Sequence, residues 1–412
     1  MYIKDEIRTL GEAAEKEIAP YFERIDEIAR FNQEKVLDAF IKNRVGENCL
    51  YPSTGYGYGD IGRETLDRIY ADIFGAEDAL VRHNIVNGTH CLAISLFSVL
   101  RPGDTLLAAT GKPYDTLEEV IGISGNSGGN LKEFGVSYRQ VDLIEGNVDF
   151  DGIKKALTPD VKAVILQRSK GYDWRDTLSC EKLGKAISFI KSLRSDVCCI
   201  VDNCYGEFAE KTEPTQHGAD LVVGSLIKNT GGSLAQCGGY IAGKKKYVEL
   251  AAYRQTAPGI GKECGATLGQ NRYMYQGLFM APHIVAQAIK SAVFCGALMQ
   301  KMGYEVNPVP QIPHYDIIQA IKFKSEEKLI KFIQGIQKAS PIDSFAVPMP
   351  WDMPGYQHQV IMAAGTFVSG ASIELSADAP IKEPYVGFMQ GGITYESARL
   401  AIMHAAGEII DL

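Results

Sequence analysis

Residues 197–208, VCCIVDNCYGEF, and residues 218–243, GADLVVGSLIKNTGGSLAQCGGYIAG, decide the fold class of this chain. The first stretch has an apolar run that ends at Asp202, and the second has one that ends at Gly224, with Ser225 and Lys228 just beyond it. Short apolar runs that alternate with amphipathic segments indicate buried strands of a mostly parallel sheet. Ligands of such sheets bind beyond the carboxyl ends of the strands, so we expect Asp202 and Lys228 to reach into one crevice.

The same alternation extends over residues 78–245, and other patterns flank it on both sides. Further strand-like runs are DTLLAAT (104–110) and VKAVILQ (161–167), with a helical segment at 178–194. A long helical pattern at 265–302, interrupted at Pro282, is expected to link this domain to another. We therefore predict an α/β chain with an N-terminal helical arm (1–44), a large domain with a mostly parallel sheet (45–275), and a linker helix with a smaller α+β C-terminal domain (276–412). In that last part, strand-like pieces at 316–323 and 359–367 alternate with helices at 325–338 and 394–410.

Composition narrows the class of ligand and the compartment. The formal net charge of −8 gives no electrostatic reason to expect nucleic acid. No apolar run reaches the roughly 18 residues that span a bilayer, and the N-terminus lacks the pattern of a signal peptide. The nine cysteines form no C-x-x-C pair and show no metal-ligand spacing with histidine. We expect a cytoplasmic protein with reduced thiols, no bound metal, no membrane contact and a small-molecule ligand.

An acid and a lysine at adjacent strand ends suit pyridoxal phosphate. The cofactor's aldehyde needs a lysine amine for a Schiff base, and its pyridinium nitrogen needs a carboxylate to stay protonated. The alternative for each residue is ordinary: Asp202 could cap a turn, and Lys228 could lie on a loop. Residues 225–228 also match the S-x-x-K motif of serine acylases, but no S-D-N or K-T-G companion is present.

A phosphate site is expected at NGTH (87–90), which precedes an apolar helical stretch from about residue 90 to 100. Backbone N–H groups at a helix N-terminus bind phosphate, and Gly88 permits close approach while Thr89 and Ser225 supply hydroxyl groups. The alternative is that Thr89 only caps the helix.

The order Gly88-Thr89-His90, Tyr114, Asp202 and Ser225-x-x-Lys228 resembles fold-type I pyridoxal-phosphate enzymes of the cystathionine/methionine gamma-lyase branch. Within that branch, five motifs are similar to those of the bacterial aluminium-resistance or methionine gamma-lyase-like proteins. They are YPSTGYGYGDIGR (51–63), NGTH (87–90), QRSKGYDWR (167–175), SLIKNTGG (225–232) and GGYIAG (238–243). The resemblance covers most of the chain and makes residues 45–275 a domain that binds pyridoxal phosphate.

The resemblance implies a role for each matching residue. Lys228 would bind the cofactor's aldehyde and move protons, Asp202 would hold the pyridinium proton, and Tyr114 would stack on the ring. Gly88, Thr89, His90 and Ser225 would surround the phosphate, and Ser169 would contact the ring hydroxyl. Arg399, in ESARLAI (396–402), would grip the substrate α-carboxylate through its planar fork. The alternatives are a core or turn tyrosine at 114 and a helix-surface arginine at 399.

Residues 55–75 open with Gly57, Gly59 and Gly62 in G-x-G-x-x-G spacing, and Asp78 follows. A Rossmann dehydrogenase would need a buried strand directly before Gly57, and the residues there include Pro52 and two small polar residues. The resemblance instead implies an arm through which Tyr56 or Tyr58 reaches the cofactor phosphate of a partner subunit. The family's arginine two residues after the tyrosine is replaced by Tyr58, and the nearest arginine is Arg63.

The resemblance implies a homodimer or homotetramer with shared active sites and a lyase that acts on an amino acid of the cystathionine or methionine type. The reaction would abstract the α-proton and eliminate a β- or γ-substituent as a thiol. Two alternatives stay open: another pyridoxal-phosphate reaction (transaminase, racemase or desulfurase-like), and a non-catalytic stress protein that retains the fold. The loop QTAPGIGKECGAT (255–267) is either an ordinary loop or a second active-site loop.

Overall fold

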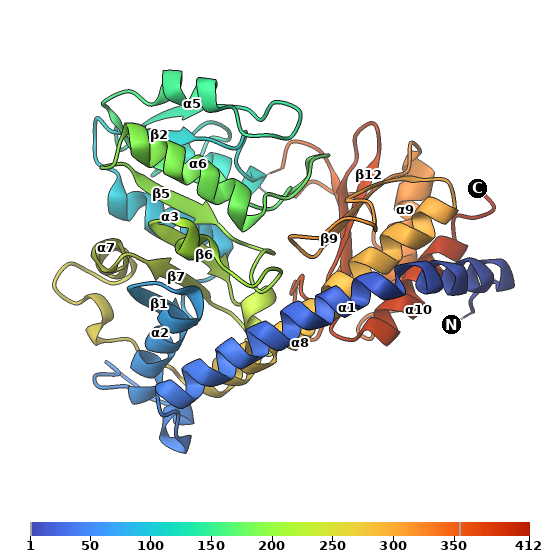
Figure 1. Ribbon diagram of the computed structural model, residues 1–412, viewed down its shortest axis with the longest axis horizontal. Coiled ribbons are helices and arrows are strands. Elements are labelled where there is room, and N and C mark those ends of the chain that lie inside the picture. The colour runs from blue at the N-terminus through green and yellow to red at the C-terminus, as the bar shows by residue number, and fades with distance from the viewer. Residues whose placement is uncertain (1, 354–355) are drawn as a thin grey trace.

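The computed structural model describes residues 2–353 and 356–412. Two β-sheets form two lobes, with the larger sheet and its helices in one lobe and the smaller sheet in the other, and a pair of long helices runs along both lobes (Figure 1). Along the sequence, the first long helix is followed by the elements of the large lobe, and the second long helix then leads into the small lobe.

The large sheet has seven strands in the order β1-β7-β6-β5-β4-β2-β3. The strands are β1 (Asp78–Arg82), β2 (Thr105–Ala108), β3 (Ser137–Gln140), β4 (Val161–Gln167), β5 (Cys198–Asp202), β6 (Leu221–Ser225) and β7 (Gly239–Gly243). Strand β7 runs antiparallel to β1 and β6, and the other pairs are parallel. The apolar runs read from the sequence at β2, β4, β5, β6 and β7 are therefore strands, and the prediction of a mostly parallel sheet is confirmed.

Helices cover both faces of this sheet, which explains why its strands are apolar runs rather than alternating ones. Along β4, Ala163 and Ile165 pack toward the cluster that contains α3 and α7, whereas Val164 and Leu166 pack toward α5 and α6. Successive side chains of a strand point to opposite faces, so each face receives every second residue. The helices of the large lobe are α2 (Ile61–Phe74), α3 (Gly88–Val99), α4 (Asp115–Ile121), α5 (Phe150–Ala156), α6 (Cys180–Leu193) and α7 (Lys245–Gln255), with 3-10 turns at Glu47–Leu50, Pro214–His217, Asn229–Gly231 and Gly261–Glu263.

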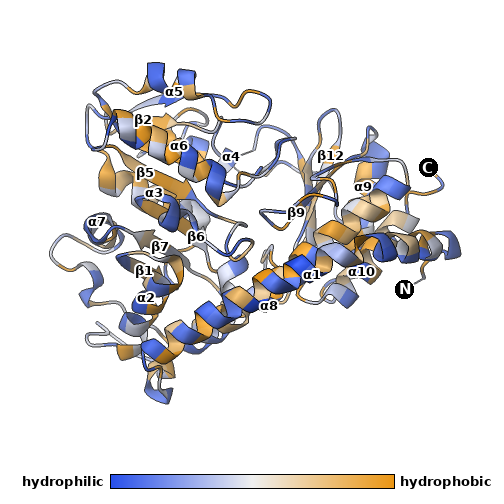
Figure 2. Ribbon diagram, in the orientation of Figure 1, coloured by the Kyte–Doolittle hydropathy of each residue, from blue (hydrophilic) through white to orange (hydrophobic). Residues whose placement is uncertain are grey.

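Helices α1 (Asp5–Lys42) and α8 (Asn271–Lys301) lie side by side and connect the lobes (Figure 1). The N-terminal segment is one helix that continues through Pro20, and α8 continues through Pro282, so the expected interruption there is wrong. A proline removes one backbone hydrogen bond, and the burial of side chains such as Ile7, Ile18 and Val285 outweighs that loss. Figure 2 shows orange hydrophobic and blue hydrophilic residues alternating along α1.

Helix α8 is long and apolar enough to cross a membrane by length and composition, and 72% of its most apolar window is buried inside the protein. Its apolar residues contact α1, the small sheet and α10. The hydropathy of this helix is therefore explained by its place in the core.

The small lobe contains an antiparallel sheet in the order β10-β11-β12-β9-β8. Its elements are β8 (Glu305–Asn307), β9 (Ile318–Lys322), α9 (Glu326–Lys338), β10 (Val360–Ala363), β11 (Ser376–Pro380), β12 (Val386–Gln390) and α10 (Tyr395–Gly407). One face, with Ala377, Ala379 and Met389, packs on α8, α9 and α10. Because the side-chain period of a strand is two, Asp378 and Phe388 lie on the opposite face, which is turned toward the large lobe.

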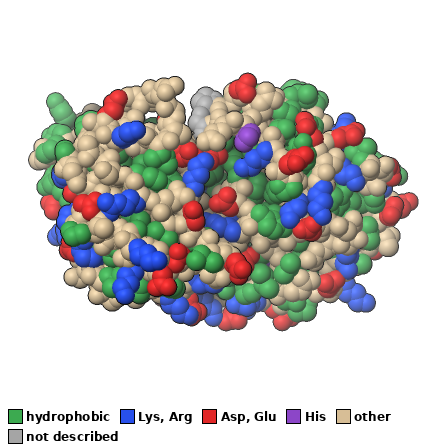
Figure 3. All heavy atoms as spheres, turned by 90° about the horizontal axis from the view of Figure 1, so that it is seen from above, with side chains coloured by type: hydrophobic (Ala, Val, Ile, Leu, Met, Phe, Trp, Pro, Cys, Tyr) green, Lys and Arg blue, Asp and Glu red, His purple; other side chains and the backbone are tan. Residues whose placement is uncertain are grey.

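Acidic and basic side chains are interspersed on the face seen in Figure 3, which looks down on the two lobes from above. This mixture agrees with the formal net charge of −8 and shows no broad basic surface on that face. Nothing on it resembles the basic stripe by which proteins neutralise nucleic-acid phosphates.

Candidate active site

A pocket of about 160 Å³ lies where the carboxyl ends of β4, β5 and β6 meet the N-terminus of α3. This is the edge at which open α/β sheets bind ligands. Seven residues expected from the sequence line it together: Gly88, Thr89, Tyr114, Ser169, Asp202, Ser225 and Lys228. The lining also includes Asn87, the first residue of NGTH, and four residues to which the sequence assigned no role: Thr116, Gln167, Cys204 and Tyr205.

Lys228 and Asp202 share this pocket, as the strand ends predict. The Nζ atom of Lys228 lies 4.2 Å from the centre of the Tyr205 ring. Burial by itself lowers the pKa of the Lys228 amine, but the acidic groups of Cys204, Tyr205 and Asp202 outweigh it and raise the pKa above the ordinary lysine value. The amine is therefore a cation held over an aromatic face beside a carboxylate.

Asp202 ends β5 with 8% of its surface exposed. The backbone N–H of Cys204 donates to its Oδ1 at 3.1 Å, which fixes the carboxylate. Its other oxygen has no hydrogen-bond donor among the residues that the structure describes. A fixed carboxylate with one free oxygen suits a ligand that presents an N–H group.

The N-terminus of α3 and the end of β6 form the opposite end of the pocket. Asn87, not Thr89, caps the helix: its side chain accepts the backbone N–H of His90 at 2.8 Å. Within the described part of the chain, the backbone N–H groups of Gly88 and Thr89 have no acceptor. A Cβ on Gly88 would lie 3.2 Å from Cys204 Sγ, so glycine brings the backbone close to the strand ends. Unpaired N–H groups beside the Ser225 hydroxyl suit a phosphate.

Of Gly88, Thr89, His90 and Ser225, which were expected around the phosphate, His90 does not line this pocket. Its Nδ1 accepts the backbone N–H of Val86 at 3.1 Å, and burial lowers the pKa of its imidazole. The ring therefore braces the turn before α3, and the expectation of a direct phosphate contact through its side chain is not supported by this placement.

The donor set fits pyridoxal phosphate on three observations. A free carboxylate oxygen, a buried amine and unpaired helix N–H groups lie around one cavity. These are the groups that a pyridinium nitrogen, an aldehyde and a phosphate require.

Tyr114 lines the pocket at the start of α4 and is part of an aromatic cluster that sequence reasoning missed. Its hydroxyl lies 2.8 Å from that of Tyr356, and its ring centre lies 5.8 Å from that of Tyr172. Burial raises the pKa of the Tyr114 phenol well above its ordinary value, with Tyr356 and Tyr205 adding to the effect. Tyr114 is therefore a neutral phenol that links the large lobe to residue 356 of the small lobe. The only sequence signal for Tyr172 was its place in QRSKGYDWR.

Ser169 and Lys170 tie the loop after β4 to the small lobe. The Ser169 hydroxyl donates to Asp316 at 3.0 Å, and the buried Lys170 amine donates to the Asn307 carbonyl at 3.0 Å and to its side-chain oxygen at 2.6 Å. Burial lowers the pKa of Lys170 to about 8. Ser169 thus lines the pocket as expected, with its proton engaged by Asp316.

Arg399 does not line the pocket, which corrects the role expected for it. It lies on α10, on the helix-covered side of the small sheet, and no residue of α10 lines the pocket. Its guanidinium pairs with Glu15 of α1 at 2.9 Å and lies 5.6 Å from the centre of the Phe294 ring. The sequence placed it on a helix, but only the packing of α10 on α1 and α8 determined its partner.

Tyr56 and Tyr58 also lie outside their own pocket, with 76% and 69% of their surfaces exposed. Their rings stack on each other with centres 5.6 Å apart. Arg63 is buried below them and donates to the carbonyls of Gly57 and Gly265, both at 2.7 Å. Arg63 therefore joins the tyrosine turn to the loop 255–267, and no strand precedes Gly57 within the described residues.

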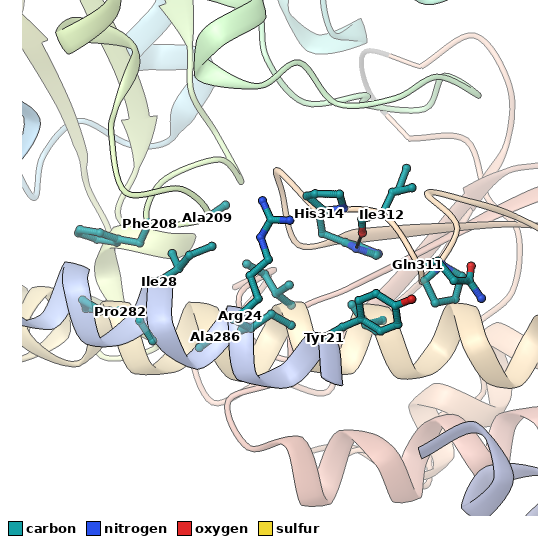
Figure 4. A pocket seen from close by; sticks show the side chains of 16 residues that line it. Tyr21, Arg24, Ile28, Phe208, Ala209, Pro282, Ala286, Gln311, Ile312 and His314 are labelled. Carbon is teal, nitrogen blue, oxygen red and sulfur yellow. Dashed lines mark hydrogen bonds between the residues drawn. The ribbon is translucent and has the colours of Figure 1, made fainter. Parts of the chain in front are cut away.

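A second cavity lies between α1, α8 and the loop 310–314, and Figure 4 shows Arg24, Phe208 and His314 around it. Most of its lining is apolar, and Arg24 is the charged side chain in it. Burial lowers the pKa of His314 to about 4. The cavity lacks the carboxylate and lysine pair that the strand-end pocket contains, so the chemistry is assigned to the latter.

Comparison with known proteins agrees with this geometry. The family model of methionine gamma-lyase matches residues 7–410. The chain belongs to the methionine gamma-lyase family. It is 50% identical over 398 residues to the Bacillus subtilis (strain 168) protein YnbB, and the aligned region covers 96% of this chain and 94% of YnbB. This membership confirms the resemblance seen in the motifs and places the chain among enzymes of the lyase class.

Solved structures show the same relation within the methionine gamma-lyase family and beyond it. A carbon-sulfur lyase involved in aluminum resistance from Clostridium novyi NT is 51% identical, with a TM-score of 0.95 over 99% of this chain and 96% of that one. The pyridoxal-5'-phosphate dependent protein YhfS from Escherichia coli is 16% identical, with a TM-score of 0.62 over 93% of this chain and 96% of that one. The latter likeness concerns the fold, and it confirms the predicted fold-type I architecture.

Proposed function

We propose that this protein is a pyridoxal-phosphate-dependent carbon-sulfur lyase that acts on a sulfur-containing amino acid of the cystathionine or methionine type. The observation that supports it most strongly is the placement of Lys228, Asp202 and the N-terminus of α3 around one cavity. The family membership supports the same cofactor and the same type of bond cleavage.

Each residue of the pocket has a task in this proposal. When bound, pyridoxal phosphate supplies an electron sink that makes the α-proton of an amino acid removable. Asp202 would hold the ring nitrogen in its protonated form, and the N–H groups of Gly88 and Thr89, with the Ser225 hydroxyl, would hold the phosphate. Lys228 would hold the aldehyde carbon and then, as a free amine, carry the proton away from the substrate α-carbon.

Two further groups would orient the reacting atoms. Tyr114 would lie against the ring, where its neutral phenol can donate a hydrogen bond. The ties of Ser169 to Asp316 and of Lys170 to Asn307 would keep the small lobe over the pocket and limit the entry of water. Elimination at the β-carbon would release a thiol, pyruvate and ammonia, and elimination at the γ-carbon would release a thiol, 2-oxobutyrate and ammonia.

Two measurements test the proposal. Purified protein reconstituted with pyridoxal phosphate is expected to acquire the visible absorption of a protein-bound cofactor, and Lys228→Ala is expected to lose the lysine-linked form of that band. Assays of thiol and keto acid with cystathionine, methionine and cysteine then identify the reaction. A protein that stays colourless refutes the cofactor, and transfer of an amino group or inversion at the α-carbon without thiol release refutes the lyase.

We also propose that the active site is shared between subunits of a homodimer or homotetramer. Tyr56 and Tyr58 support this, because two large aromatic side chains lie exposed on a turn that Arg63 fixes from below. Such residues suit a contact with the cofactor phosphate of a partner subunit. Light scattering that gives a monomer at micromolar concentration would contradict the shared site.

A further inference from the structure

The ring of Tyr205 contacts the Lys228 amine, and no task has been assigned to it. The Nζ atom of Lys228 lies 4.2 Å from the centre of this ring, and both residues line the strand-end pocket. Among the described residues, the amine has no hydrogen bond and no carboxylate within ion-pair distance, so the acidic groups around it act at longer range. In the part of the chain that the structure describes, the direct partner of the amine is therefore the aromatic ring.

The attraction comes from the face of the ring and not from a phenolate. Burial raises the pKa of the Tyr205 phenol above its ordinary value, and Lys228 opposes that rise, so the phenol is neutral near pH 7. An ammonium group within about 6 Å of the centre of an aromatic ring is attracted by the ring quadrupole, and more strongly where water is excluded. A neutral amine lacks this attraction. The contact therefore favours the charged form of Lys228.

Other acidic groups also act on the amine. Asp202 ends β5, Cys204 and Glu207 belong to the loop after β5, and Asp378 belongs to β11 of the small lobe. Burial raises the pKa of Glu207 to about 8 and that of the Cys204 thiol well above its ordinary value, so both are mainly neutral near pH 7. None of these four groups is removed by a substitution of the ring, so such a variant isolates the contribution of the ring.

The chain holds the ring in place from both lobes. Tyr205 has a φ of 73°, a left-handed conformation that bulky residues adopt only where the surrounding structure fixes them. The buried side chain of Asn229, the residue after Lys228, donates to the Tyr205 carbonyl at 2.9 Å. The Tyr205 hydroxyl donates to Ser372 Oγ of the small lobe at 3.1 Å. The ring is therefore anchored to both lobes and to the loop that bears the lysine.

We propose that Tyr205 is a positioning residue that binds the Lys228 ammonium on its ring face and keeps it beside the cofactor site whenever the amine is not bonded to the cofactor. This inference rests on the proposed function, since it concerns the interval in which a substrate amino group has displaced the lysine. During that interval Lys228 carries a proton on Nζ. Tyr205 then determines where Nζ lies and how tightly it holds that proton.

The test measures how fast the free amine of the cofactor-free chain bonds to pyridoxal phosphate. Only a neutral amine attacks an aldehyde, so a weaker hold on the ammonium makes bond formation faster at a fixed pH below the pKa of the amine. The rate constant at saturating pyridoxal phosphate is followed by stopped-flow absorption, which separates this step from cofactor affinity. Lys228→Ala gives the background from other lysines.

Three variants separate the ring from its hydroxyl. Tyr205→Leu removes the aromatic face and keeps an apolar side chain at the same backbone position. Tyr205→Phe keeps the ring and removes the hydroxyl. Ser372→Ala is the matched control, because it removes the same hydrogen bond from the small lobe and leaves Tyr205 intact.

We expect Tyr205→Leu to raise the rate constant by about 5- to 30-fold, which corresponds to the loss of a cation–ring contact shielded from water. Tyr205→Phe and Ser372→Ala should stay within about threefold of the unmodified protein, because both retain the ring. A rate constant that is unchanged or lower in Tyr205→Leu would overturn the inference. An equal rise in all three variants would overturn it as well, since the hydroxyl and not the ring would then be responsible.

A second measurement keeps the inference testable apart from the proposed function. If the unmodified protein stays colourless with pyridoxal phosphate, the proposed function fails. The rate of reductive methylation of Lys228 by formaldehyde and a borane reductant, followed by peptide mass spectrometry, also requires the neutral amine. A rise of about 5- to 30-fold in Tyr205→Leu alone would support the contact, and an unchanged rate would overturn it.

Discussion

Replacing Arg399 with alanine separates the role that the sequence implied from the place that the structure gives it. The ion pair with Glu15 joins α10 to α1, and the side chains of the two residues are 19% and 34% exposed. A partly exposed ion pair contributes about 0.2 to 1 kcal/mol, and a cation over a ring such as that of Phe294 adds about 0.5 to 1 kcal/mol. Arg399→Ala should therefore lower the free energy of unfolding by about 1 to 2 kcal/mol in all.

The two roles differ most clearly in the kinetics. A destabilisation of this size lowers the melting temperature by a few degrees and, because Arg399 does not line the pocket, should leave kcat/KM within about threefold. An arginine that held the substrate carboxylate would contribute about 2 to 5 kcal/mol, so its loss would lower kcat/KM by about 30-fold or more.

The assay combines thermal unfolding of the cofactor-loaded protein with steady-state thiol release. Glu15→Gln is the matched control, because it removes the same ion pair from the α1 side and retains an acceptor for Tyr395. The double variant should be about as stable as Arg399→Ala alone, since that variant already lacks both the ion pair and the contact with Phe294. An unchanged melting temperature together with a large rise in KM for Arg399→Ala would refute the placement of Arg399 on the helix-covered side of the small sheet.

Three other predictions follow from the same geometry. Asp202→Asn keeps the Cys204 contact and removes the charge, so cofactor affinity measured by absorption titration should fall about 10- to 100-fold. Asp104→Asn is the control: Asp104 precedes the amino-terminal end of β2, whereas the pocket lies at the carboxyl ends of the strands, so cofactor affinity should not change. Folding raises the pKa of Asp378 from 3.8 to about 6, so between these pH values the folded protein binds more protons than the unfolded chain and loses stability as pH rises. The melting temperature of cofactor-free Asp378→Asn minus that of the unmodified protein should therefore increase from pH 3.8 to about pH 6. A melting-temperature difference that does not change with pH would contradict the burial of a charged group at this position. The double variant Tyr56→Ala/Tyr58→Ala should retain its melting temperature at high protein concentration but should dissociate into subunits more readily on dilution. Light scattering that shows unchanged association of subunits would contradict the proposed contact of these tyrosines with a partner subunit.

Much of the large lobe could be predicted because its information is local. The apolar run that ends at Asp202 is a strand with the expected end, and the run expected to end at Gly224 is a strand that ends at Ser225. The helix expected from about residue 90 begins at Gly88 and is capped by Asn87 rather than Thr89. The motif order then identified seven residues that line one pocket. Strand order and parallel direction bring strand ends together, so side chains at those ends meet whatever the rest of the chain does.

The small lobe's contribution was not predictable in the same way. Asp378, Tyr172 and Tyr356 belong to three separate segments, and no spacing in the sequence relates them. Which face of β11 turns to the large lobe depends on its register with β12 and on which side the helices cover. The interruption expected at Pro282 failed for a related reason, because the packing of α8 against α1 outweighs a local preference.

Residue types at fixed spacing along a strand, a turn or a helix start were enough to predict the fold class, the family and seven residues that line the strand-end pocket. The packing of distant elements was needed to show that Arg399 pairs with Glu15, that Tyr56 and Tyr58 lie exposed, and that Asp378 lies on the sheet face turned toward the large lobe. These outcomes depend on which faces of distant elements pack together, and that is set by the burial of whole surfaces rather than by any short motif.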